Sequence, residues 1–117
     1  MARLASMNCT PCREGGTPLG EEKIAELRED VPEWDVVEQD GIKRLERTFS
    51  FPDFESALAF TDDVGEMAEE QGHHPRIVTE WGSVTLTWWT HKIGGLHQND
   101  FIAAAKSDEI YEEYEDS

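Results

Sequence analysis

Residues 69–91 read EEQGHHPRIVTEWGSVTLTWWTH, and the apolar pattern changes from helical to strand-like within this stretch. Gly72 precedes the two histidines, and glycine is common just beyond the last turn of a helix. Pro75 disfavours helical conformation at the residue before it. The stretch therefore predicts the end of a helix, followed by two strands over 76–81 and 84–90 that a short turn joins.

A long helix is predicted before this stretch, from Asp53, a good N-cap, to about residue 71. Its apolar residues recur at three- and four-residue steps and would form one buried face; they are Ala57, Phe60, Val64, Met67 and Ala68. Further upstream, Asp40 and Gly41 predict a tight turn between strands over 34–38 and 42–50. The apolar alternation of the second strand is imperfect, which indicates an edge strand or a partly wet sheet.

Two further helices are predicted, over 21–30 and 98–114. The expected order is therefore α-β-β-α-β-β-α, and short hairpins imply antiparallel pairing. We expect an α+β fold, a four-stranded antiparallel sheet with three helices on one face. Residues 1–18 are expected to form an irregular leader and residues 19–117 a single domain. On the other face, Trp81, Trp88 and Trp89 are expected near one end, lining a ligand cleft or meeting a second subunit.

The charge is strongly unbalanced, with 26 acidic against 10 basic residues and a formal net charge of -16. Such a field disfavours direct binding to nucleic acid or to an anionic membrane surface. Neither a transmembrane run nor a secretory signal is evident, so a cytoplasmic location is expected. The acidity fits either an ordinary acidic protein or adaptation to a salt-rich cytoplasm.

Cys9 and Cys12 form one Cys-x-x-Cys motif in a leader rich in proline and glycine. Two thiols cannot supply the four ligands of a structural zinc. A redox site of this spacing needs a helix start after a strand. Reduced thiols in a loop are therefore expected, with a metal shared between subunits as the alternative.

Three of the four histidines, His73, His74 and His91, fall close together in this part of the sequence. Histidine gives and takes protons near neutrality, because its ordinary pKa is about 6.5. Adjacent extended histidines point to opposite faces, so no metal is predicted, although His74 and His91 with Glu69 or Asp100 could bind one. We expect His74 and His91 at the same end of a hairpin, acting as acid and base across a ligand.

Neighbouring acids have a functional and a structural interpretation. Glu69 lies one helical turn before His73 and could face the same site, or it could be a solvated helix acid. Asp100 could likewise serve the site or only pair with the dipole of the last helix. His97 is interpreted as the N-cap of that helix.

The residues described so far resemble the pterin-4a-carbinolamine dehydratase family. The resemblance covers about residues 9–113. It rests on Glu69-x-x-x-His73-His74-Pro75, Trp81, Val84, Trp89-Thr90-His91, Gly95-Leu96, Asp100 and Ala104, and upstream on Cys9-x-Pro11-Cys12, Leu19, Val31-Pro32-x-Trp34 and Leu45-x-Arg47-x-Phe49. The chain departs from the family's common pattern at Gly72, Trp88 and Lys92.

The resemblance implies the fold expected above and the dehydration of 4a-hydroxytetrahydropterin to quinonoid dihydropterin, a step in tetrahydrobiopterin recycling that needs no cofactor. It implies that His73, His74 and His91 are catalytic. His74 is taken as the leading acid or base, His91 as its partner, and His73 as the residue that orients and stabilises charge. Substrate-binding roles are carried over to Glu69, Pro75, Thr90 and Asp100, and Trp89 could stack on the pterin or only pack.

The resemblance also implies a homodimer or homotetramer. Two alternatives remain open. The first is a non-catalytic module for pterin binding or protein dimerisation, since animal relatives dimerise a homeodomain transcription factor. The second is a role in molybdopterin-related metabolism.

Overall fold

The computed structural model describes residues 19–115, and within them it confirms the expected order of helices and strands. The elements are α1 (Glu21–Arg28), β1 (Asp35–Gln39), β2 (Ile42–Ser50), α2 (Phe54–Gln71), β3 (Arg76–Glu80), β4 (Ser83–Trp88), a single 3₁₀ turn η2 (His91–Ile93) and α3 (Gln98–Glu115). The leader, with Cys9 and Cys12, lies outside the described residues.

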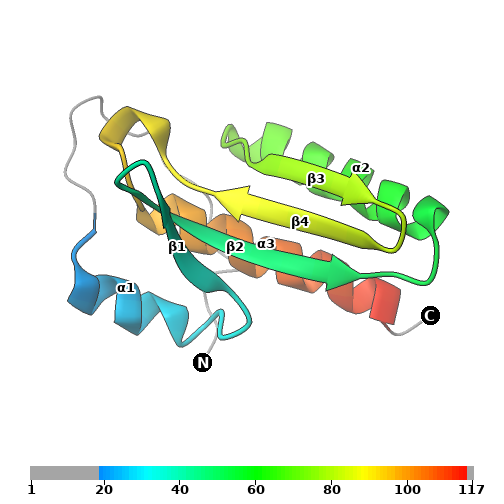
Figure 1. Ribbon diagram of the computed structural model, residues 1–117, viewed down its shortest axis with the longest axis horizontal. Coiled ribbons are helices and arrows are strands. Elements are labelled where there is room, and N and C mark those ends of the chain that lie inside the picture. Colours follow the sequence, from blue (N-terminus) through cyan, green and yellow to red (C-terminus); the bar gives the residue numbers. More distant parts are fainter. Residues whose placement is uncertain (1–18, 116–117) are drawn as a thin grey trace.

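The four strands form one antiparallel sheet in the order β1-β2-β4-β3. In Figure 1, α2 and α3 run behind the sheet, and α1 lies beside β1 near one end of α3. β2 pairs with a strand on each side, so the interpretation of it as an edge strand is wrong. Its alternation is imperfect because Lys43 and Arg47, which share the helix-covered face with the buried core residues, pair with acids of the helices, Glu21 and Asp108.

The register separates the two faces. Leu45 lies opposite Trp88, and Phe49 opposite Val84, and all four side chains are buried under the helices. Residues between them, such as Thr48 opposite Thr85, point to the open face.

The expectation that three tryptophans share one region is wrong. Trp88 belongs to the buried core under the helices. Trp89 follows it and so points to the open face. Trp81 is 75% exposed and lies in the turn between β3 and β4, at the opposite end of that hairpin from the histidines.

Local capping determines where α2 begins and ends. The Asp53 carboxylate accepts a hydrogen bond from the Ser56 N–H at 2.8 Å, which satisfies a free donor of the first turn. Gly72 closes the helix with a φ of 65°, a left-handed conformation that suits glycine. The His73 N–H then donates to the Ala68 carbonyl at 3.2 Å, so the chain leaves the helix with His73 in a defined place.

A reciprocal capping box starts α3. His97 Nδ1 accepts from the Asn99 N–H at 3.0 Å, and Asp100 Oδ2 accepts from the His97 N–H at 2.9 Å. The structural interpretation of His97 is therefore supported by its contacts. None of the helices described combines the length and the apolar character needed to cross a membrane.

Candidate active site

His73 is bound to the first turn of α3 by a buried carboxylate. Its Nε2 lies 2.6 Å from Oδ1 of Asp100; the His73 side chain is 12% exposed and the Asp100 side chain 0%. The contact joins the end of α2 to the start of α3, which are far apart in sequence. Asp100 therefore binds a side chain of the site in addition to interacting with the dipole of α3.

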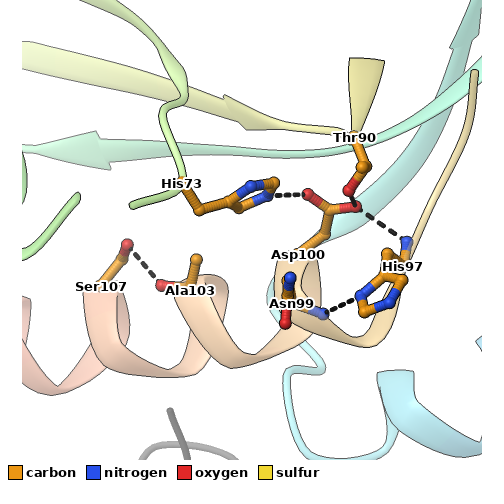
Figure 2. A network of polar contacts seen from close by, with 7 residues as sticks. All are labelled: His73, Thr90, His97, Asn99, Asp100, Ala103 and Ser107. Atoms are coloured by element: carbon orange, nitrogen blue, oxygen red, sulfur yellow. Dashed lines mark hydrogen bonds and ion pairs between the residues drawn. The ribbon is translucent and has the colours of Figure 1, made fainter. Parts of the chain in front are cut away.

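Asp100 accepts hydrogen bonds from three different parts of the chain, as Figure 2 shows. Besides His73, the Thr90 hydroxyl donates to Oδ2 at 2.9 Å, and so does the His97 N–H at 2.9 Å. A carboxylate has only acceptor oxygens, so His73 Nε2 is the donor in this pair. The lone pair of the neutral imidazole is then on Nδ1, which is the nitrogen able to accept a proton.

Trp88 packs flat against the same imidazole. The ring centroids are 5.5 Å apart and the planes differ by 15°. Trp88 is fully buried, and its Nε1 is a buried donor without a hydrogen-bond partner among residues 19–115. Trp88 was expected with Trp81 and Trp89 beside a ligand cleft or a second subunit, and as a departure from the family pattern, so its stacking on His73 was not predicted. Strand alternation, which puts Trp88 on the same face as Leu86, is the signal that could have found it.

His74 is bound to the last turn of α2 rather than to α3. Its Nε2 contacts Oε2 of Glu69, and both side chains are largely exposed, 63% for His74 and 76% for Glu69. Glu69 is therefore both a solvated helix acid and a partner of a site histidine. The adjacent histidines thus have separate carboxylate partners on separate helices.

His91 is the first residue of the η2 turn, which follows β4, and its side chain lies beside that of Trp89. Its ring lies 4.7 Å from the Trp89 ring with a tilt of 53°. The Thr90 N–H donates to the Gly95 carbonyl at 2.9 Å, and this bridge closes the loop that carries His91. His91 is exposed, as His74 is.

Pro75 lies between His74 and the first residue of β3, where it directs the backbone into the strand. The structure thus brings His73, Thr90 and Asp100 into one network, and joins Glu69 to His74 and Trp89 to His91. Within residues 19–115, no three His, Cys, Asp or Glu side chains gather in a group that could hold a metal ion.

Similar proteins place this chain in a known family. A family model described as pterin 4 alpha carbinolamine dehydratase matches residues 17–110. The chain belongs to the pterin 4 alpha carbinolamine dehydratase family. The family is one of lyases that act on pterins, and the matched range includes every site residue named above.

Individual relatives of the pterin 4 alpha carbinolamine dehydratase family match over nearly the whole chain. A protein of Chlorobium limicola, provisionally named as such a dehydratase, is 57% identical over 112 residues, which are 96% of this chain and 99% of the relative. One from Microcystis aeruginosa with the same provisional name is 50% identical over 111 residues, 95% of this chain and 96% of the relative.

A solved structure also matches. The crystal structure described as transcriptional coactivator/pterin dehydratase from Brucella melitensis superposes with a TM-score of 0.74 and 30% identity. It covers 80% of this chain and 98% of its own. The sheet and helices described above are therefore those of a pterin dehydratase.

Proposed function

We propose that this protein catalyses the removal of water from 4a-hydroxytetrahydropterin, and that His73, His74 and His91 are its catalytic residues. The reaction breaks the C4a–O bond, transfers a proton to the departing hydroxyl and removes the proton from N5, giving quinonoid dihydropterin and water. One group must donate a proton and another must accept one. Imidazoles suit both tasks near neutral pH.

The observation that carries the proposal is the contact between His73 Nε2 and the buried Asp100 carboxylate. A histidine held in this way has one defined tautomer and one defined ring orientation, which is what a proton acceptor or a charge-stabilising group requires. A fully hydrogen-bonded carboxylate that ties His73 to the start of α3 goes beyond what capping the helix alone would need.

The exposure of the histidines supports a division of roles. His74 and His91 are exposed and can exchange protons with water between turnovers. His74 is assigned as the leading acid or base and His91 as its partner, with His73 orienting the substrate and stabilising charge. Glu69 holds His74, and Pro75, Thr90 and Trp89 support the substrate or the histidines beside it.

Stopped-flow measurement of the dehydration of synthetic carbinolamine tests the proposal. His74→Ala and His91→Ala should each lower kcat by about 10²–10⁴-fold, the range for one acid or base group. A wild-type rate in His74→Ala would disprove its assignment. His97→Ser is the matched control, because it removes a histidine while keeping a good N-cap for α3, and its rate should stay within about twofold of wild type.

The physiological role is part of the same proposal. Hydroxylation of aromatic amino acids would leave the pterin as its 4a-hydroxy compound, and dehydration by this protein would return that pterin for reuse. A non-catalytic pterin-binding or dimerising role would instead give ligand binding without turnover in the same assay. The homodimer or homotetramer that the family implies stays a prediction, and sedimentation measurements would test it.

A further inference from the structure

Arg44 is a nearly buried cation on the open face of the sheet. Its neighbour on β2, Leu45, points into the core opposite Trp88, so Arg44 points to the other face. Arg44 is only 9% exposed, and its Nε is buried without a hydrogen-bond partner in the described part of the chain.

The other partly buried arginines of the described chain differ from Arg44. Arg28 donates to the Trp34 carbonyl, and Arg47 forms an ion pair with Asp108 at 2.7 Å. No ion pair within residues 19–115 includes Arg44. The acid two residues along the same face, Glu46, instead accepts a hydrogen bond from the Thr87 hydroxyl at 2.9 Å.

Arg44 lies beside the candidate active site. Its guanidinium carbon is 4.1 Å from the centroid of the Trp89 ring, and the Trp89 ring is 4.7 Å from the ring of His91. Arg44, Trp89 and His91 therefore form a continuous row from β2 to the loop after β4. We call these three residues the Arg44 row.

A guanidinium in this position lacks the partners it usually has. Burial of a charged group is unfavourable unless hydrogen bonds or an opposite charge compensate, and stacking on an aromatic ring compensates only in part. The chain has 26 acidic residues, so a counter-charge was available in the sequence. Guanidinium donors match the planar oxygens of a carboxylate or a phosphate.

We propose that Arg44 and Trp89 form a subsite, next to His91, for an anionic group on the substituent of the heterocyclic substrate. The proposal rests on the proposed function, because it takes the ring of the substrate to lie at the histidines. In a pterin the substituted carbon C6 is bonded to N5, which in turn is bonded to C4a. C6 is therefore two bonds from the reacting carbon, so a substituent on C6 can reach Arg44 and Trp89 while C4a is at His91.

Isothermal titration calorimetry with three stable oxidised pterins tests the subsite. The ligands are 6-hydroxymethylpterin, its phosphate ester and pterin-6-carboxylate. Wild type should bind at least one of the two anionic ligands about tenfold or more tightly than the neutral one, although the net charge of the protein opposes this. The two anionic ligands distinguish a phosphate subsite from a carboxylate subsite.

Three variants separate the subsite from general electrostatics. Arg44→Gln should remove the preference for the anionic ligand, and Arg44→Lys, which keeps the charge but not the planar donors, should keep part of it. Lys43→Gln is the matched control: it removes the same charge from the same strand, but Lys43 points to the other face, where it pairs with Glu21. Its preference should equal that of wild type.

Equal binding of neutral and anionic ligands by wild type would overturn the subsite, and so would an equal loss of preference in Lys43→Gln. Should Arg44→Gln fail to fold when checked by urea unfolding, Arg44→Lys decides, and a preference equal to that of wild type in Arg44→Lys would overturn the subsite. Dehydration of a neutral carbinolamine is measured in parallel on wild type. Failure of that assay alone would reject the proposed function, while the calorimetry would still decide the subsite.

Discussion

His73 Nε2 and Asp100 Oδ1 lie 2.6 Å apart, and this contact joins the end of α2 to the first turn of α3. Asp100 meets two requirements at once, because the same carboxyl group caps α3 and holds an imidazole of the site. The stability of α3 and the orientation of His73 are therefore coupled. Substitutions at this pair should affect both unfolding and dehydration.

Asp100→Asn should lower kcat for dehydration by about 10²-fold. An amide brings hydrogens of its own to a place where three donors converge, so His73 must change tautomer or lose its partner. The free energy of unfolding should fall by about 1–3 kcal/mol, since one buried donor loses its acceptor. Stopped-flow kinetics, urea unfolding and the ¹⁵N shifts of the His73 ring measure the three effects.

Thr90→Val is the control for this change. It removes one donor to Asp100 but leaves the His73 contact in place. Its kcat should fall by less than about tenfold. A wild-type rate and tautomer in Asp100→Asn would contradict the orienting role of Asp100.

Replacement of Glu69 by Gln should slow dehydration about tenfold while hardly affecting stability. The Glu69 carboxylate holds the ring of His74, but both side chains are largely exposed, so the pair contributes less than about 1 kcal/mol to folding. Glu70→Gln provides the comparison, with the same charge change at the next, exposed residue. Equal rates in the two variants would remove Glu69 from the site.

Two fully buried tryptophans should respond differently to substitution by phenylalanine. Trp34 Nε1 donates to Asp108 at 2.9 Å, whereas Trp88 Nε1 has no hydrogen-bond partner among the residues that the structure describes. Trp34→Phe loses a hydrogen bond to a partly buried carboxylate, and Trp88→Phe removes an unsatisfied donor. We expect Trp34→Phe to be the more destabilising by about 1 kcal/mol or more in urea unfolding. The opposite order would show that the Trp88 N–H finds a partner in solution.

Trp88→Ala should be far more severe than Trp88→Phe. It opens a large cavity at the centre of the core, and such a change usually lowers the free energy of unfolding by about 3–5 kcal/mol. It also removes the ring that stacks on His73. A low dehydration rate in Trp88→Ala with an ordinary rate in Trp88→Phe would assign the aromatic surface itself a part in holding His73.

Tyr114 should ionise only at unusually high pH. Burial, the hydrogen bond to Asp63 and the charges of nearby acids raise the pKa of Tyr114 to about 12 from an ordinary 10.0. The folded state therefore favours the neutral phenol, and the resulting stabilisation is complete below pH 10 and is lost as the pH rises towards about 12. Ultraviolet titration follows the phenolate, and Asp63→Asn should lower the pKa.

Tyr114→Phe is the reference for the stability curve. Its unfolding free energy should decline less steeply than that of wild type between pH 10 and about 12. Identical slopes in the two proteins would mean that Tyr114 does not lose stabilising contacts on ionisation.

The candidate site was only partly predictable. The histidines before Pro75 and at the end of the second hairpin could be found, because three of the chain's four histidines fall in one short stretch. Their partners could not: Glu69 was expected one turn before His73, yet it binds His74. The left-handed Gly72 turns the chain between the two elements, and helical spacing does not extend past such a turn.

By itself the sequence determined the helices, the strands and their order, because apolar period, N-caps and turn residues act over a few neighbouring positions. The buried face of α2, from Ala57 to Ala68, follows from the same local pattern. Only the tertiary structure decided that β2 lies inside the sheet, that Asp100 meets His73 and that Arg44 stacks on Trp89. These contacts depend on strand register and on how α3 packs against the sheet, and both are set by the burial of the whole core rather than by any short segment.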